Sequence, residues 1–232
     1  MKTVICENNL LASRVAEHIR STIESKADAV LALSAGNTMV GLWDALAQMC
    51  DAGELSFRSV RILLTAELMD TEKEHSCRHA LEAGLLRRID VSPENCFFPD
   101  PKDPGAFDQQ IESLGGIDLA VLGIGQNGHI GYNEPGTLFE SHTRVQKLTD
   151  RTKRQLLSRG FTPDIMPEQA VTMGIKTLTG AKNIAVIAAG EEKASAVFQM
   201  IYGKTVTYIP ASFLQIPLNV TVYLDRAAAS EL

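Results

Sequence analysis

Short, almost wholly apolar runs recur along the chain, and most are followed by stretches in which apolar residues return every three or four positions. A short apolar run between polar residues is typical of a buried strand, and the longer period is typical of an amphipathic helix. The predicted strands are residues 2–6, 28–33, 60–64, 117–122, 183–188 and 219–224. The predicted helices are residues 10–25, 38–50, 75–88 and 191–202, and a short polar helix is expected to close the chain.

This alternation predicts the class of fold. Strands that are apolar along their whole length must be covered on both faces, and their alternation with helices is the pattern of a parallel sheet. We therefore predict an α/β fold over residues 1–232: a single domain, Rossmann-like, with a mostly parallel sheet and helices on both faces. Because ligands of such sheets bind beyond the carboxyl ends of the strands, we expect a site in the loops after residues 33, 64, 122 and 188.

The composition of the chain argues against some classes of binding partner. The 232 residues are 45% hydrophobic and 22% charged, as in ordinary globular proteins. The net charge of -6, without a basic tract, argues against binding to nucleic acid. No segment reaches the roughly 18 apolar residues of a membrane span, and the N-terminus lacks the apolar run of a signal peptide. We expect a cytoplasmic protein that does not engage membranes; assembly into a homo-oligomer is left open.

The sequence does not predict a metal site or a cofactor. The four cysteines are scattered and form no CxxC pair, so we expect buried, reduced thiols. His75 and His79 lie four positions apart on a predicted helix, but Ser76 stands where the zincin pattern requires glutamate.

The first loop after a predicted strand contains small and hydroxyl-bearing residues. Small residues let the backbone approach a ligand closely, and the start of the following helix supplies free N–H groups that attract an anion. The loop is either a phosphate cradle or an ordinary strand-to-helix turn. It is not a Walker loop, because the GK[ST] ending is absent, and Ala32 in place of glycine argues against a nucleophile elbow. The candidate phosphate ligands in it are Ser34, Gly36, Asn37 and Thr38.

A glycine-rich segment, GIGQNGHIGYNEPG, follows the predicted strand 117–122. Gly123, Gly125 and Gly128 satisfy the G-x-G-x-x-G pattern of dinucleotide-binding proteins, but loop residues follow where that fold needs a helix. The segment instead places His129 between glycines, with Glu134 five residues later. An imidazole exchanges protons near neutral pH and a carboxylate can orient it, so the pair favours catalysis over a structural histidine.

At this point the sequence resembles a known family. The run GIGQNGHIGYNEPGTLFESHTRVQKLT is similar to the signature of the glucosamine-6-phosphate deaminase/isomerase family, and the resemblance extends over residues 29–232. LSAGNT resembles the phosphate loop of that family, with Asn37 and Met39 replacing its usual glycine and proline. AVTMGIKTL, GEEKASAV and IPASFLQ resemble its later blocks. Galactosamine-6-phosphate isomerases and 6-phosphogluconolactonases are relatives of this family.

The resemblance implies a sugar-phosphate isomerase fold and a cofactor-free enzyme. Its substrate would be a hexosamine 6-phosphate, converted to a ketose 6-phosphate and ammonia. His129 would open the sugar ring, Glu134 would orient His129 and balance its charge, and Asn127 occupies a position that the family fills with Asp or Asn. The residues expected to hold the substrate phosphate are Ser34, Gly36, Asn37, Thr38, Arg159 and Lys193.

One departure from the family bears on the chemistry. Family members carry an Asp-Glu pair whose aspartate removes the C2 proton, and the matching pair here is Ala66-Glu67. Because alanine accepts no proton, three explanations remain open. Glu67 or Asp70 serves as the base; the protein binds a sugar phosphate with little turnover; or the pocket runs another reaction, such as lactone hydrolysis by water that His129 activates.

Overall fold

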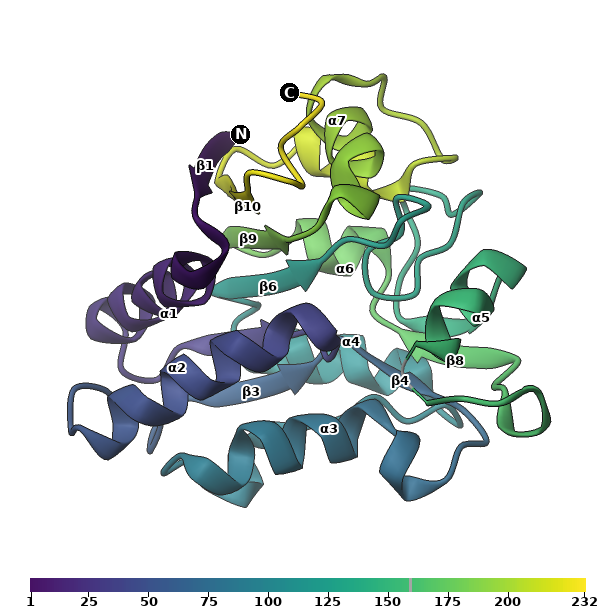
Figure 1. Cartoon of the computed structure of the whole chain (residues 1–232). Helices are drawn as coiled ribbons and strands as arrows, with labels where there is room; N and C mark the ends of the chain where they lie inside the picture. The colour runs from purple at the N-terminus through teal and green to yellow at the C-terminus, as the bar shows by residue number, and fades with distance from the viewer. Residues whose placement is uncertain (159) are drawn as a thin grey trace.

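The computed structural model describes residues 1–158 and 160–232, and the strands in this part of the chain form two sheets (Figure 1). The larger sheet has seven strands in the order β1-β10-β9-β6-β2-β3-β5, and every neighbouring pair in it is parallel. Its strands are β1 (Lys2–Cys6), β2 (Val30–Leu33), β3 (Arg61–Leu64), β5 (Cys96–Phe97), β6 (Leu119–Gly123), β9 (Asn183–Ala188) and β10 (Val220–Asp225).

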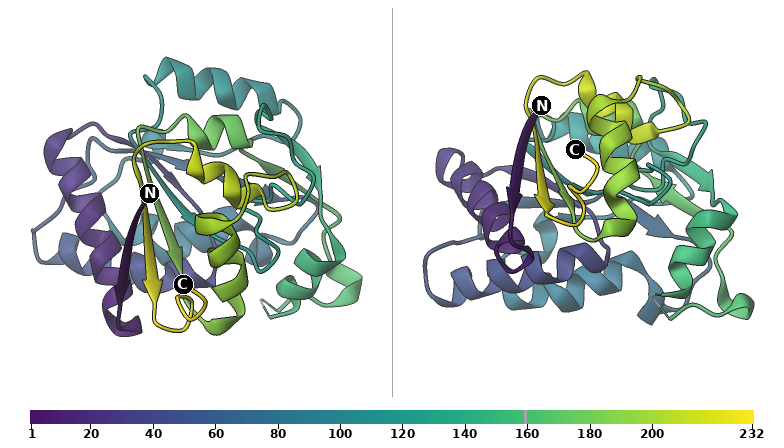
Figure 2. Two further views of the ribbon diagram at one scale, coloured as in Figure 1. Left: turned by 90° about the horizontal axis from the view of Figure 1, so that it is seen from above. Right: turned by 45° about the horizontal axis from the view of Figure 1, so that its top comes forward.

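Alternating side chains of the inner strands enter two separate hydrophobic clusters, one on each face of the sheet. In β2, Leu31 and Leu33 belong to one cluster, whereas Val30 and Ala32 belong to the other. Helices α1, α2 and α3 cover the first face, and α4, α6 and α7 cover the second (Figures 1 and 2). These helices are α1 (Asn8–Ser25), α2 (Val40–Asp51), α3 (Cys77–Gly84), α4 (Pro104–Ser113), α6 (Ile175–Thr179) and α7 (Ala194–Tyr202). Burial on both faces explains why the strands are continuously apolar.

The smaller sheet is antiparallel and lies at the carboxyl end of the larger one. Its strands, in order, are β4 (Ala66–Leu68), β8 (Gln169–Thr172) and β7 (Arg144–Lys147). Thr65 is the one residue between β3 and β4, and its backbone joins the two sheets: its N–H donates to Leu33 and its carbonyl accepts from Met173. The chain therefore leaves the parallel sheet at Thr65 and carries Ala66 over the edge where a ligand is expected.

The structure confirms the predicted class of fold and the six predicted strands. The predicted helix at residues 75–88 is wrong in part, because Ser76 is extended and α3 begins only after it. The Ser76 hydroxyl accepts the N–H of His79 at 2.9 Å, which makes this residue the cap of α3 rather than part of a longer helix. Three helices, α4, α5 (Asp150–Leu157) and α6, were not predicted, and neither were β5 and the whole smaller sheet.

The predicted closing helix is also wrong, since residues 226–231 form successive turns. The side chain of Asp225, at the end of β10, accepts the N–H of Ala228 at 2.7 Å and that of Gly190 at 3.1 Å. The Asp225 side chain thereby ties this end of the chain to the segment after β9. Ala228 is fully buried, so the turns are packed against the body of the protein.

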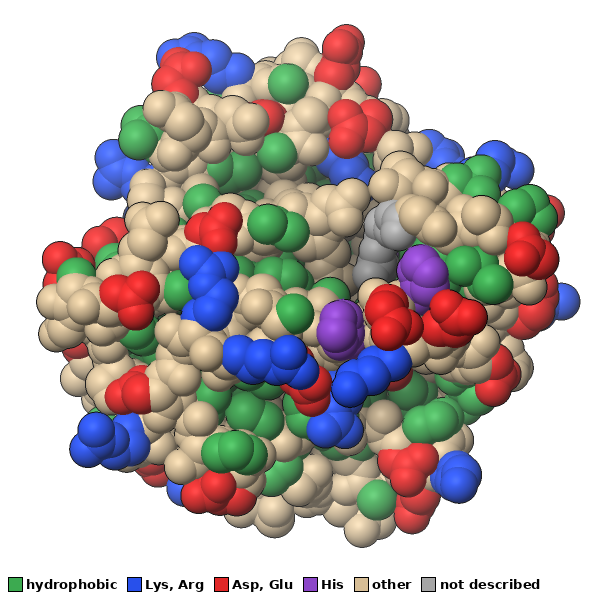
Figure 3. Space-filling model, turned by 60° about the horizontal axis from the view of Figure 1, so that its bottom comes forward, with side chains coloured by type: hydrophobic (Ala, Val, Ile, Leu, Met, Phe, Trp, Pro, Cys, Tyr) green, Lys and Arg blue, Asp and Glu red, His purple; other side chains and the backbone are tan. Residues whose placement is uncertain are grey.

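Two surface properties bear on partners. Among the described residues, no helix has both the length and the apolar character needed to cross a bilayer. On the face drawn in Figure 3, Lys and Arg side chains are interspersed with Asp and Glu. That no nucleic acid binds stays a prediction.

Helices α2 and α3 pack through a glycine. A Cβ atom added to Gly84 would lie 2.4 Å from Cε3 of the buried Trp43 side chain. We expect Gly84→Ala to lower the free energy of unfolding by about 1–3 kcal/mol, because the overlap outweighs the better helix propensity of alanine. Gly41→Ala is the matched control: its Cβ would make an ordinary 3.5 Å contact with Ala12, so it should stabilise by roughly 0.5–1 kcal/mol. Urea unfolding measures the free energy of unfolding of both variants. Equal changes in Gly84→Ala and Gly41→Ala would contradict the close packing of Gly84 on Trp43.

Candidate functional site

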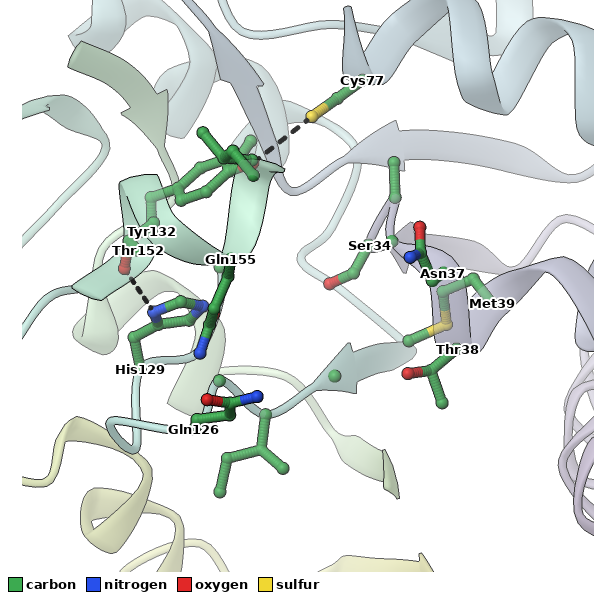
Figure 4. Close-up of a pocket in the computed structure, with 18 of the residues that line it drawn as sticks. Ser34, Asn37, Thr38, Met39, Cys77, Gln126, His129, Tyr132, Thr152 and Gln155 are labelled. Carbon is green, nitrogen blue, oxygen red and sulfur yellow. Dashed lines mark hydrogen bonds between the residues drawn. The ribbon is translucent and has the colours of Figure 1, made fainter. Parts of the chain in front are cut away.

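A cavity of about 610 Å³ opens at the carboxyl ends of β2, β3 and β6 (Figure 4). This volume lies within the range of roughly 300–1,000 Å³ that is usual for small-molecule sites. Its walls come from the turn after β2, the start of β4, the loop after β6, helix α5 and the segment before α7. The four loops in which the sequence predicts a site therefore meet around one cavity.

The turn after β2 has the geometry expected of an anion site. Ser34, Gly36, Asn37 and Thr38 all line the cavity. Asn37–Met39 forms a 3₁₀ turn that leads into α2, and no described side chain caps the N-terminus of either element. The N–H of Ser34 donates to Val121 and that of Met39 to Gly36, so the N–H groups of residues 35–38 have no described partner and are left for a ligand. A Cβ atom added to Gly36 would meet nothing within 4 Å, so the space above the turn is open.

Lys193 reaches the same cavity from the segment between β9 and α7. Burial lowers the pKa of its ammonium group, whereas the carboxylate of Glu192 raises it and Arg151 lowers it further. A bound anion would offset this desolvation, which fits the predicted phosphate contact. Arg159, the other cation predicted to hold phosphate, lies outside the described residues.

The loop after β6 brings an imidazole and a carboxylate together. The Glu134 side chain is 2% exposed, and its Oε2 lies 3.7 Å from Nδ1 of His129. Asn127 joins the two: its Nδ2 donates to Glu134 Oε2 at 2.8 Å, and its Oδ1 accepts the His129 N–H at 3.1 Å. The three residues predicted to act together are therefore in mutual contact.

Two threonines of the α5 segment complete this group. Thr149 donates to Glu134 Oε2 from its hydroxyl at 3.1 Å and to Oε1 from its backbone N–H at 3.3 Å. The hydroxyl of Thr152 lies 3.2 Å from His129 Nδ1 (Figure 4). Neither residue is predicted from the sequence. Thr149 could have been found as the N-cap of α5, since its hydroxyl accepts the N–H of Thr152 at 3.3 Å.

These contacts set the charge of Glu134. Burial alone would raise the pKa of its carboxyl group, but His129, the Thr152 hydroxyl and the Thr149 N–H lower that pKa to about 2. The carboxylate therefore stays ionised at neutral pH and acts as an electrostatic partner of His129 rather than as a proton acceptor. With Nδ1 occupied by Thr152, the ring presents Nε2 to the cavity (Figure 4).

The glycines of this loop make room for the His129 ring and allow the tight turn around it. A Cβ atom added to Gly125 would lie 2.5 Å from Nε2 of His129, so only glycine leaves room for the ring. Gly128 has φ of 81°, in the left-handed region that favours glycine. The G-x-G-x-x-G spacing is thus explained by a tight loop around an imidazole, in agreement with the argument against a dinucleotide site.

The structure places Glu67 at the beginning of α3 and outside the cavity lining, so its role as the catalytic base stays a prediction without support from this geometry. Its carboxylate accepts the N–H groups of Cys77 and Arg78, each at 2.7 Å, at the beginning of α3. Neighbouring side chains of a strand point to opposite faces, and here Ala66 lines the cavity while Glu67 does not. Asp70 is likewise absent from the described lining.

Two further cavity residues were not predicted. Cys77, the first residue of α3, and Tyr132, at the end of the histidine loop, both line the cavity near Ala66. The Sγ of Cys77 lies 3.9 Å from the Tyr132 hydroxyl (Figure 4). Nothing in the local sequence pattern marks them, because their approach depends on the pairing of β4 with β8.

Comparison with known proteins is consistent with this geometry. Residues 8–222 match the family described as glucosamine-6-phosphate isomerases/6-phosphogluconolactonase. Glucosamine-6-phosphate deaminase 2 of Bacillus subtilis (strain 168) is 38% identical over 243 residues, covering 100% of this chain and 98% of the relative. The glucosamine-6-phosphate deaminase of Hahella chejuensis (strain KCTC 2396) is 39% identical over 241 residues, covering 100% and 92%.

Solved structures agree at the level of the fold. A monomeric glucosamine-6-phosphate deaminase has a TM-score of 0.95 and 36% identity, with 100% of both chains covered. The 6-phosphogluconolactonase from Trypanosoma brucei has a TM-score of 0.80 at 20% identity, covering 100% of this chain and 98% of its own, and so shares the fold. The predicted resemblance is confirmed.

The ionised Glu134 predicts an acid-sensitive fold. Its pKa of about 2 lies below the ordinary value of 4.5, so its stabilisation is complete above pH 4.5 and is lost as the pH falls through 2. We expect this group to remove about 3 kcal/mol of unfolding free energy over that interval, from 1.36 kcal/mol per pKa unit. Urea unfolding between pH 6 and the acid limit should show a flatter profile for Glu134→Gln than for wild type.

The matched control is Glu54→Gln, which removes an exposed glutamate. Its profile should follow that of wild type, because exposed charges contribute little. If Glu134→Gln kept the full acid sensitivity, the buried carboxylate would not be its source.

Proposed function

This chain belongs to the family of glucosamine-6-phosphate isomerases and 6-phosphogluconolactonases, and we propose that it acts on a hexosamine 6-phosphate, releasing ammonia and a ketose 6-phosphate. One observation carries the proposal: the anion site after β2 and the His129–Glu134 pair line or border the same cavity. Such a cavity suits a ligand with a phosphate at one end and a group that exchanges protons at the other.

The phosphate end is supported by two kinds of donor. The N–H groups of residues 35–38 and the ammonium group of Lys193 would share the phosphate oxygens. In Figure 4, Ser34, Asn37 and Thr38 lie on one side of the cavity and His129 on the other. A hexose bound by its 6-phosphate would therefore direct C1 towards His129.

Ring opening is the step that His129 is placed to perform. The C1–O5 bond breaks, the proton on O1 passes to O5 through the imidazole, and C1 and O1 form the carbonyl group. While the ring carries the proton, the ionised Glu134 balances its charge. Thr152 holds the imidazole in the orientation that presents Nε2.

The next step requires a base at C2, where the family resemblance places aspartate and this chain has Ala66. The C2 proton must leave, a proton must reach C1, and water must hydrolyse the C2 imine to release ammonia. Among the described residues that line the cavity, Glu192 is the carboxylate, and it neighbours Lys193 at the phosphate end. Losing a general base typically lowers the rate by ~10² to 10⁴, so we propose that turnover is slow.

Ala66 also favours a second candidate, a protein that binds the sugar phosphate without converting it. Both candidates need the same phosphate site and differ in whether ammonia appears. Glucosamine and galactosamine 6-phosphates, which differ at C4, are the two substrates to compare.

Restoring the carboxylate tests the missing base. We expect Ala66→Asp to raise kcat for ammonia release from a hexosamine 6-phosphate by ~10² to 10⁴, because it returns a proton acceptor to the cavity wall. Ala66→Asn is the matched control, similar in size but unable to accept a proton, and should bring no gain.

Two results would contradict this account. The first is equal gains from Ala66→Asp and Ala66→Asn. The second is complete loss of a fast wild-type activity in a stably folded Glu67→Gln variant, which would restore Glu67 as the base despite its contacts with α3.

A further inference from the structure

Helix α5 presents the carboxamide of Gln155 to the cavity, one turn beyond Thr152 and beside the cationic Arg151 and Arg154. Gln155 lies three positions after Thr152, and residues at this spacing share a face of a helix. Both line the cavity, and Thr152 is in contact with the His129 ring at 3.2 Å. In Figure 4 the Gln155 side chain extends towards His129, on the side of the cavity opposite Ser34 and Thr38.

The amide nitrogen of Gln155 lacks an acceptor. Its Nε2 is shut off from solvent and has no hydrogen-bond partner in the part of the chain that the structure describes. An unsatisfied buried donor destabilises a fold, and a methionine of similar length would fill the same volume without that penalty. The terminal torsion of glutamine is broad, so the amide can turn towards a ligand at little cost.

The position of the Gln155 amide indicates which atom of a ligand it would bind. Cationic Lys193 and the backbone N–H groups of the turn occupy the phosphate end, whereas Gln155 is a neutral donor on the wall that holds His129. A neutral amide is suited to a hydroxyl or carbonyl oxygen. In the proposed reaction, the oxygens that meet His129 are those attached to C1.

We propose that Gln155 binds the C1 oxygen of the substrate and holds it beside Nε2 of His129. This inference rests on the proposed function, and it adds a residue that selects for an oxygen at C1. Thr152 would then orient the imidazole of His129, and Gln155 would orient the C1 oxygen on which the imidazole acts.

Two unreactive ligands can measure the contribution of the contact between Gln155 and the C1 oxygen. 2-Amino-2-deoxyglucitol 6-phosphate and its 1-deoxy derivative differ by the C1 hydroxyl alone, and neither has a carbonyl group, so neither can react. We expect wild-type protein to bind the hydroxylated ligand about tenfold more tightly in calorimetry, as one net hydrogen bond allows. Gln155→Met should bind both ligands equally, with a melting temperature no lower than that of wild type.

Gln126→Met is the matched control, because it removes another carboxamide from the same cavity. It should keep the preference for the C1 hydroxyl. The proposal is overturned if wild type shows no preference, if Gln155→Met retains the preference, or if Gln126→Met loses it instead. In those cases binding of both ligands would leave the proposed function standing; if wild type bound neither ligand, both would fail.

Discussion

The site depends on keeping one buried carboxylate ionised. Glu134 is almost fully buried, and its charge is stabilised by Asn127, Thr149 and the partner imidazole. These contacts join the loop after β6 to helix α5 through hydrogen bonds between buried polar groups. Without the ionised carboxylate, a protonated His129 would have no counter-charge and α5 would lose its anchor at the cavity.

The parallel sheet could be predicted from the sequence because its signal is local. Buried strands such as Asn183–Ala188 are apolar at every position after the first, and the helices between them have apolar residues at a helical period. The smaller sheet gives no such signal: Arg144–Lys147 is polar and only partly buried, and Ala66–Leu68 has three residues. These strands exist through pairing across the chain, with Ala66 opposite Thr172, which local patterns do not encode.

The same distinction applies to the site. The loop residues Ser34 and His129 could be predicted, because each follows a recognisable strand and the carboxyl ends of parallel strands converge. The positions of Glu67 and Gln155 could not. Which of Ala66 and Glu67 faces the cavity depends on the register of β4, and the approach of Gln155 to His129 depends on where α5 packs. What distinguishes this cavity is the methyl group of Ala66 where the family resemblance leads one to expect a carboxylate.

The central claim is that one hexosamine phosphate spans the cavity from the turn after β2 to the imidazole. A crystal structure with bound 2-amino-2-deoxyglucitol 6-phosphate tests it directly. We expect phosphate oxygens about 3 Å from the backbone N–H groups of residues 35–38, and the C1 end within about 3 Å of Nε2 of His129. A ligand bound with its phosphate away from that turn, or with C1 directed away from His129, would contradict it.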